Sequence, residues 1–203
     1  SRFLVPADSE GLVTVPSPEI IAPHVLGELE FNDVVLNESS RLGEPGAAFR
    51  HVLATLSVFR ISVAGAALGV MEGALREAVK HCSNREQFGR PLAKHGPVAT
   101  LLADSWADLE SSRYLTYQTA SLASVDPGKN LDRSSLAKLA ATEAATRVVD
   151  RCVQTMGRWG LIRGSKIEKF YRQARPMRVY EGASEVLRLG ITARLMSEYN
   201  DES

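Results

Sequence analysis

The sequence has few of the residue types that build disulfide frameworks and metal centres. Its 203 residues include two cysteines, Cys82 and Cys152, which lie far apart, and four histidines without a regular spacing. Neither set has the spacing of metal ligands, and so low a cysteine count is typical of proteins in a reducing compartment. We therefore expect a cytoplasmic protein with no metal site.

An excess of charge of either sign is also missing. Basic and acidic residues balance at 24 each, for a formal net charge of +0. Binding to nucleic acid or to an anionic membrane usually requires a basic surplus, so we expect neither partner. The longest nearly uncharged run, residues 61–71, is shorter than the roughly 20 residues that cross a bilayer, and no membrane span is expected.

Several motifs with a known chemistry are absent too. The sequence has no GxGxxG or Walker loop, and no pattern of a serine or cysteine nucleophile with its histidine. No secretory signal is visible, although the first residue is Ser1 and not methionine. We expect an internal start or the remnant of a tag at this end.

Short β-type runs occupy the first part of the chain. The stretches RFLVPA, LVTVP and HVLGELEFNDVVL are rich in valine, leucine and phenylalanine and are broken by proline, aspartate, asparagine and glycine. Residues 27–31 alternate glutamate with apolar or small residues, which is the period of a strand. Two or three strands leave edges and an apolar face uncovered, so residues 1–43 are interpreted as the C-terminal remnant of a β-domain.

From about Glu44 the apolar residues recur at helical steps. Short links between the helical stretches predict a mainly α fold, an antiparallel helical bundle over residues 44–203. A loop is expected over 124–135, with Ser134 as the N-cap of the helix that follows. The predicted helices cover 46–82, 97–124, 135–156, 165–174 and 184–196.

Two glycines interrupt the middle of the first predicted helix. Glycine is about 1 kcal/mol less favourable than alanine in a helix interior, yet Gly65 and Gly69 lie there. Either another helix or a ligand could approach closely at these positions, and we predict close helix packing.

Three stretches combine unusual residues at the ends of predicted helices: NREQFGRPL (84–92), QTMGRWG (154–160) and YEGASE (180–185). Taken alone, the first two are better explained as glycine-stopped helix ends, the second with a buried Trp159. In the third, Ser184 is a candidate cap with Glu181 just outside the helix. A helix N-terminus at this point would favour a phosphate group.

In this order and spacing, the three stretches resemble the C-terminal part of the acyl-CoA dehydrogenase family. NREQFGRPL is similar to the family's Arg-x-x-Phe-Gly signature and QTMGRWG to its Gln-x-x-Gly-Gly-x-Gly stretch. RQARPMRVYEGASEVLR resembles its signature Arg-Asp-Ala-Arg … Tyr-Glu-Gly-Thr-Ser-Glu. The likeness covers nearly the whole chain, because ELEFNDVVLNESSRLGEPGAAF resembles the end of the family's middle β-domain and the entry to its helical domain.

The resemblance implies an FAD-dependent oxidoreductase of fatty acid metabolism that desaturates acyl thioesters. Glu181 would be the base that removes the α-proton while the β-hydride passes to FAD, and Gly182 would let the backbone lie against the substrate. Ser57 and Arg60 would lie on the substrate side of the first helix. The implied partners are a coenzyme A or acyl-carrier thioester, an electron-transfer flavoprotein or similar acceptor, and further copies in a homodimer or homotetramer.

The resemblance also implies FAD contacts at two places in the chain. One set matches residues that reach the FAD of a neighbouring subunit, and the other matches the segment beside the subunit's own FAD. The first set is Arg85, Gln154 and Arg158, and the second set is Ala183, Ser184 and Glu185.

The chain departs from the family pattern at several positions. Gly96 stands where members often carry glutamine, Arg158 replaces a glycine, and Gln173 replaces an aspartate. The family's N-terminal helical domain and the first half of its β-domain are not in this sequence. Two alternatives therefore stay open: a non-catalytic helical assembly subunit or fragment that completes a partner's FAD site, and an acyl-CoA oxidase, which gives its electrons to oxygen.

Overall fold

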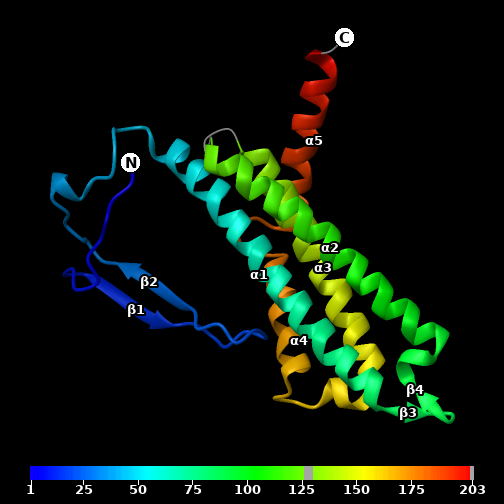
Figure 1. Ribbon diagram of the computed structural model, residues 1–203. Coiled ribbons are helices and arrows are strands. Elements are labelled where there is room, and N and C mark those ends of the chain that lie inside the picture. Colours follow the sequence, from blue (N-terminus) through cyan, green and yellow to red (C-terminus); the bar gives the residue numbers. More distant parts are fainter. Residues whose placement is uncertain (126–129, 202–203) are drawn as a thin grey trace. The chain divides into compact units, whose positions relative to one another are not determined.

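The chain forms two compact units, Ser1–Thr55 and Leu56–Ser203 (Figure 1). Residues 1–125 and 130–201 are described by the computed structural model. Helix α1 (Ala48–Asn84) begins in the first unit and continues through the second. The domain boundary predicted at residues 43 and 44 stays a prediction.

The first unit contains a two-stranded antiparallel sheet. Strand β1 (Leu12–Pro16) pairs with β2 (Gly27–Phe31), with Leu12 opposite Phe31 and Pro16 opposite Gly27. The run RFLVPA forms no strand, and Phe3 makes only an isolated bridge to Arg41. The alternation predicted for residues 27–31 is present, but all five residues of β2 are exposed. Residues 27–31 thus form the predicted strand. No layer of the described residues covers its apolar side chains.

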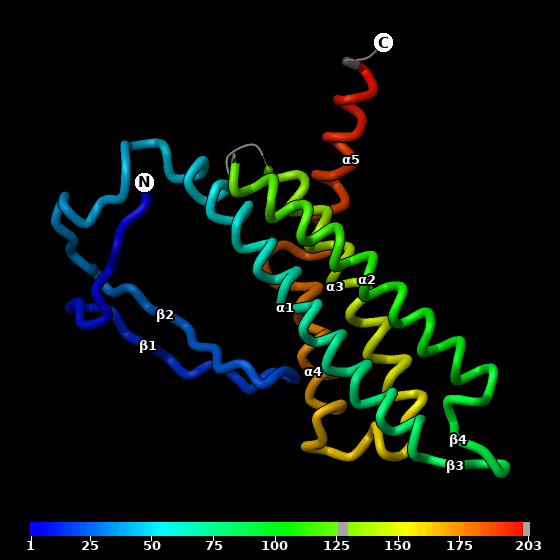
Figure 2. The backbone as a smooth tube through the Cα atoms, in the orientation of Figure 1, coloured from blue at the N-terminus to red at the C-terminus, as the bar shows by residue number. Residues whose placement is uncertain are grey.

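The second unit is a bundle of helices, as the sequence predicts (Figure 2). Helix α3 lies at its centre and packs against α2, α4 and α5. Short 3-10 turns, η2 (Leu92–Lys94) and η4 (Gly157–Leu161), lie in the links. The helices that follow α1 are α2 (Gly96–Val125), α3 (Leu131–Met156), α4 (Lys166–Met177) and α5 (Ser184–Asp201).

Small side chains fill most of the bundle core. Steps of three and four residues place one stripe of α1 against its neighbours, and alanine at most of these positions allows close approach of the helices. Leu109 of α2 and Ile167 of α4 supply larger side chains. The buried stripe of α1 consists of Ala64, Ala67, Met71, Ala74, Ala78 and Cys82, and that of α3 includes Ala137, Ala141, Ala144, Ala145, Val148 and Val149.

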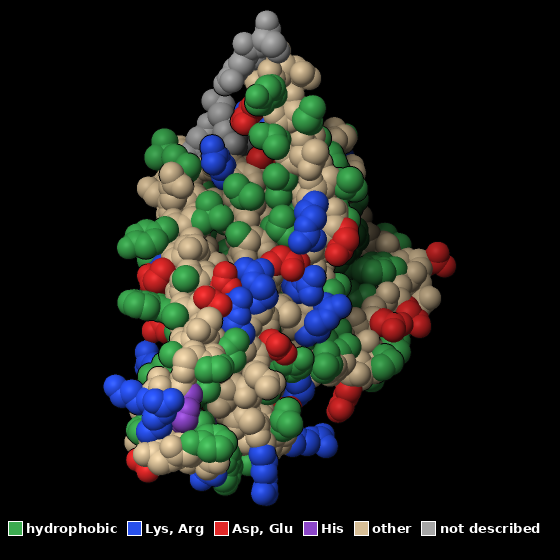
Figure 3. Space-filling model, turned by 90° about the vertical axis from the view of Figure 1, so that its right-hand side faces the viewer, with side chains coloured by type: hydrophobic (Ala, Val, Ile, Leu, Met, Phe, Trp, Pro, Cys, Tyr) green, Lys and Arg blue, Asp and Glu red, His purple; other side chains and the backbone are tan. Residues whose placement is uncertain are grey.

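Ion pairs connect α2 and α3 at the edge of this core. Asp108 of α2 pairs with Arg147 at 3.0 Å and with Arg151 at 2.8 Å, both from α3. On the face that Figure 3 shows, acidic and basic side chains are intermixed rather than gathered by sign. That distribution agrees with the zero net charge.

The prediction about Gly65 and Gly69 was wrong. A Cβ atom added at either position meets nothing within 4 Å in the described residues, so no helix packs closely there. Close packing occurs instead at Gly73, one turn further on, where an added Cβ would lie 2.6 Å from the ring of Phe170.

We expect Gly69→Ala to raise the free energy of unfolding by about 0.4–1 kcal/mol, because alanine restricts the unfolded chain and meets no neighbour. Gly73→Ala is the matched control, in the same helix, and should lower it because the packed ring of Phe170 must move. Urea denaturation of both variants measures the difference. Equal changes in the two variants would contradict this account of the glycines.

Two helix ends differ from the sequence prediction. Helix α3 begins at Leu131 with Asn130 as its N-cap residue, so Ser134 is not the cap. Its hydroxyl is buried in the first turn and donates to the carbonyl of Leu131. The loop expected over 124–135 is therefore shorter, and its residues 126–129 lie outside the described part of the chain.

The stretch NREQFGRPL is a tight hairpin and not only a helix end. Strand β3 (Glu86–Gln87) pairs with β4 (Arg90–Pro91), and Gln87 lies opposite Arg90. The two turn residues, Phe88 and Gly89, have φ angles of 50° and 75°. Positive φ at both positions is the conformation of a type I′ turn, which matches the twist of a two-residue hairpin.

Helix α1 is longer than the nearly uncharged run of residues 61–71 that it contains. By length and composition alone it could cross a membrane, with a mean hydropathy of 1.7 over its most apolar window. One such helix is weak evidence, because the core helix of a bundle passes the same test. The buried stripe of α1 packs into the core of the second unit, but only 28% of the most apolar window is buried, so burial within this chain accounts for part of its apolar character.

Candidate active site

The candidate site is the loop between α4 and α5. After α4 ends at Met177, the N–H groups of Val179 and Tyr180 both donate to the carbonyl of Pro176. The N–H of Ser184 then donates to the carbonyl of Arg178 at 3.0 Å. These bonds shape the short connection in which Glu181 lies.

The backbone at Glu181 and Gly182 has an unusual conformation. Glu181 has a φ of 55°, in the left-handed region that residues other than glycine rarely adopt. Gly182 follows with a φ of 104°, and a Cβ atom there would lie 3.1 Å from Leu187 and 3.2 Å from a guanidinium nitrogen of Arg60. Position 182 therefore requires glycine both for its conformation and for space. Strain at a single non-glycine residue is often found at functional sites.

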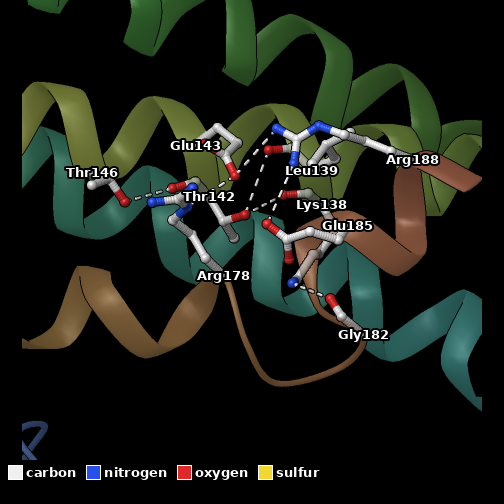
Figure 4. A network of polar contacts seen from close by, with 9 residues as sticks. All are labelled: Lys138, Leu139, Thr142, Glu143, Thr146, Arg178, Gly182, Glu185 and Arg188. Atoms are coloured by element: carbon white, nitrogen blue, oxygen red, sulfur yellow. Dashed lines mark hydrogen bonds and ion pairs between the residues drawn. The ribbon is translucent and has the colours of Figure 1, made fainter.

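Two cations from different helices hold the carbonyls of this loop. Arg60 of α1 donates from Nε to the carbonyl of Glu181 at 3.0 Å and from Nη1 to the hydroxyl of Ser135 at 2.9 Å. Lys138 of α3 donates from Nζ to the carbonyl of Gly182 at 2.8 Å (Figure 4). Successive carbonyls are thus fixed from α1 and from α3.

One oxygen of the Glu181 carboxylate is left without such a partner. This Oε2 atom is buried and accepts no hydrogen bond from the residues that the structure describes. Burial lowers the pKa of Arg60, and the negative charge of Glu181 partly opposes that shift. Burial also raises the pKa of Tyr180, and the charge of Glu181 acts in the same direction. A buried carboxylate oxygen that no donor occupies can accept a proton from a bound molecule.

A second polar network lies beside the loop. Glu143 of α3 accepts from Nε of Arg178 at 2.9 Å and pairs with Arg188 of α5 at 3.5 Å (Figure 4). Burial acts to raise the pKa of Glu143, but the hydrogen bond and charge of Arg178 and the charge of Arg188 oppose it, and the pKa stays below its usual value. The network ties both ends of the loop to α3.

Two charged residues of the site are missing from the sequence prediction, Lys138 and Glu143. A signal for Lys138 exists in the sequence. In SLAKLAATEAAT it stands three and seven residues before Ala141 and Ala145, on the face that the helical period buries. A charged residue in the apolar stripe of a helix indicates a buried partner.

The residues predicted to lie near the base do gather around the loop. Ser57 is buried in α1, close to one turn before Arg60. The carbonyl of Ala183 accepts the first hydrogen bond of α5, from Leu187, so Ala183 and not Ser184 has the N-cap position. Ser184 is buried, whereas the side chain of Glu185 is 77% exposed.

The other predicted FAD residues lie at the far end of the bundle. Cys82 near the end of α1 contacts the carbonyl of Thr155 near the end of α3, so Arg85 and Gln154 belong to the same end. Arg85, Gln154 and Arg158 are exposed, and the guanidinium of Arg158 lies over the ring of Trp159. Trp159 itself is 51% exposed, so the prediction that it is buried was wrong.

The residues around the Glu181 loop and the predicted FAD residues at the far end of the bundle are separated by much of the length of α1. From Arg60 to Cys82 the helix extends about 33 Å, at roughly 1.5 Å per residue. The structure therefore places the predicted FAD contacts in two separate regions and not in one site. No cluster of three potential metal ligands occurs among the described residues.

Comparisons with known proteins agree with this architecture. Residues 47–196 match the family model described as acyl-CoA dehydrogenase, C-terminal domain. The chain is 38% identical to the short-chain specific acyl-CoA dehydrogenase, mitochondrial, of Rattus norvegicus, over 98% of this chain and 48% of that protein. It is 34% identical to the caffeyl-CoA reductase-Etf complex subunit CarC of Acetobacterium woodii, over 98% of this chain and 52% of that protein.

The fold is shared with solved structures. Butyryl-CoA dehydrogenase from Megasphaera elsdenii superimposes with a TM-score of 0.91 and 31% identity, over 96% of this chain and 51% of that chain. The chain thus spans about half the length of the relatives that it matches. Because the family model covers most of its residues, the chain belongs to the acyl-CoA dehydrogenase family, whose members are FAD-dependent oxidoreductases.

Proposed function

We propose that the complete protein containing this chain is an acyl-CoA dehydrogenase in which Glu181 removes the α-proton of an acyl thioester. One observation carries the proposal: the buried Oε2 of Glu181 has no hydrogen-bond partner in the described residues, while two cations hold the carbonyls of Glu181 and Gly182. A surface carboxylate would be solvated or paired. FAD, when bound, would accept the hydride from the β-carbon.

The loop also offers a donor for the substrate oxygen. As the α-proton leaves, negative charge develops on the thioester oxygen and must be stabilised. Within residues 1–125 and 130–201 the N–H of Glu181 donates to no protein acceptor, so it is available for that oxygen. Removal of one such donor typically costs about 3 kcal/mol of transition-state stabilisation. Gly182 would leave room for the acyl chain, because it has no side chain.

The residues of this chain fit the phosphate groups of FAD. Exposed guanidinium groups at Arg85 and Arg158 form a donor set suited to a pyrophosphate. The N-terminus of α5, with Ala183, Ser184 and Glu185, would lie beside a second FAD, since helix N-termini favour anions. The separation of these regions along α1 supports a homodimer or homotetramer in which one copy completes the FAD site of another.

The substrate class follows from the relatives. The names of these relatives refer to coenzyme A thioesters, including short-chain acyl-CoA, butyryl-CoA and caffeyl-CoA. We therefore propose a coenzyme A thioester as the substrate of this protein. The complex of CarC with Etf supports an electron-transfer flavoprotein or a similar acceptor. Ser57 and Arg60 would act on the substrate side through the loop that Arg60 holds.

The test is anaerobic mixing of the flavin-loaded protein with a panel of acyl-CoA thioesters, butyryl-CoA first. We expect the flavin absorbance to bleach at a rate of the order of 1–10³ s⁻¹ with the best substrate. Flavin that stays oxidised with every thioester would contradict the proposal and favour a helical assembly subunit. Rapid reoxidation by oxygen at the turnover rate, without another acceptor, would indicate an acyl-CoA oxidase instead.

A further inference from the structure

We propose that Lys138 is a positioning residue for the base: its side chain holds the carbonyl of Gly182 and thereby fixes the direction in which the loop presents Glu181. The inference rests on the proposed function of Glu181 as the base. It assigns a role to a residue of α3 that neither the sequence motifs nor the proposed chemistry uses.

The burial of Lys138 is the first observation. Its side chain has no exposed surface in this chain, although lysine is almost never fully buried unless it is paired. Its neighbours on the buried face of α3 are small and uncharged (Ser134, Ser135, Ala141 and Thr142), so none of them neutralises the ammonium charge. The ammonium group must therefore be retained for a contact outside α3.

That contact is with the strained part of the loop. Nζ donates to the carbonyl of Gly182 at 2.8 Å. Gly182 is also the residue at which the loop could most easily change conformation, because glycine populates a wide range of φ and ψ angles. The hydrogen bond restrains the peptide group between Gly182 and Ala183. Arg60 restrains the preceding peptide group, between Glu181 and Gly182, through the carbonyl of Glu181.

The charges around Lys138 fit a contact of this kind. Burial lowers its pKa to about 8, and the charge of Arg60 acts in the same direction. Three carboxylates oppose that shift: Glu143, Glu181 and Glu185. Either protonation state of the amine keeps an N–H for Gly182, so the hydrogen bond does not depend on the charge.

A purely structural lysine and a positioning lysine predict different results. A structural role lowers the stability of the whole bundle and leaves the loop unchanged in those molecules that fold. A positioning role loosens residues 178–184 in particular and slows proton removal, while FAD and thioester still bind. Misplacement of a reacting group by about 1 Å can cost on the order of 10²-fold in rate.

The variant Lys138→Met keeps the unbranched apolar stem of the side chain but removes the donor. In the complete flavin-loaded protein we expect anaerobic flavin reduction to slow by about 10- to 100-fold, with the apparent Kd of the acyl-CoA within about threefold. Hydrogen exchange of the loop amides should accelerate at least about tenfold, while exchange in α3 stays the same.

Thr142→Val is the matched control. Thr142 is equally buried, one turn further along α3, and among the described residues its hydroxyl bonds to carbonyls of its own helix alone. We expect its rate and its loop exchange to stay within about threefold of the wild type. If Lys138→Met does not accumulate as folded protein, Lys138→Gln serves the same test, because its shorter amide cannot reach Gly182.

A double variant separates positioning from other effects. When Glu181→Gln has already removed the base, adding Lys138→Met should change the residual rate by less than about twofold, since coupled residues are not additive. Equal losses in both backgrounds, or unchanged loop exchange in Lys138→Met, would overturn the inference. If wild-type flavin is not reduced at all, the proposed function fails, and the exchange measurement alone decides whether Lys138 anchors the loop.

Discussion

Glu181→Gln in the complete flavin-loaded protein is expected to lower the rate of flavin reduction by acyl-CoA by about 10²- to 10⁴-fold. Glutamine is nearly isosteric and keeps the backbone N–H, so the flavin and the thioester should still bind. It has no basic oxygen, so the α-proton loses its acceptor. The measurement is anaerobic stopped-flow bleaching of the flavin with the best thioester of the panel.

The matched control for this variant is Glu198→Gln. Glu198 is a half-exposed glutamate of α5 whose ion pair with Arg194 lies away from the loop. Exposed pairs contribute little to stability, so this variant should retain the wild-type rate and unfold within about 1 kcal/mol of it. A rate for Glu181→Gln within about tenfold of the wild type would show that Glu181 is not the base.

Met71→Ala should lower the free energy of unfolding by about 2–5 kcal/mol. Met71 is fully buried in the stripe of α1, where its neighbours are mostly alanines. Helices whose contacts consist of backbone and methyl groups cannot easily move inward to fill the space of a lost side chain. Urea denaturation monitored by helical circular dichroism measures the change.

Met196→Ala provides the comparison for Met71→Ala. Met196 of α5 is 55% exposed in this chain, so the same truncation there should change the free energy of unfolding by no more than about 0.5 kcal/mol. A loss below about 1 kcal/mol for Met71→Ala would mean that the core relaxes around the cavity, contrary to the rigid packing inferred here.

The helices could be predicted well because their periodicity is strong. The first helix was predicted over 46–82 and extends over Ala48–Asn84, since its buried stripe repeats without interruption. Its neighbour α3 began four residues earlier than predicted, because Asn130 and Ser134 are both good caps and the sequence does not rank them. The hairpin after α1 was missed because Phe88–Gly89 lacks the Asn-Gly pattern of most type I′ turns.

The site was predictable only in part. The resemblance to a family identified Glu181, Gly182 and Arg60, and the structure does bring these residues together. The conformation of the loop was not predictable, because a positive φ at Glu181 follows from contacts with α1 and α3 and not from local sequence. The partner of Lys138 was hidden for the same reason, since a backbone carbonyl leaves no trace in a sequence pattern.

The hydrogen bonds that hold the loop also determine when the site can exist. Arg60 and Glu181 are 121 residues apart in the chain, and Lys138 and Gly182 are 44 apart. Contacts between residues so far apart in sequence form late in folding, because closing a long loop lowers the entropy of the chain before the contact can stabilise it. A partly synthesised or partly folded chain can therefore contain α1, α2 and α3 while Glu181 is still mobile and solvated. With Glu181 as the proposed base, proton removal from a thioester would begin only in the fully folded protein and not in its folding intermediates.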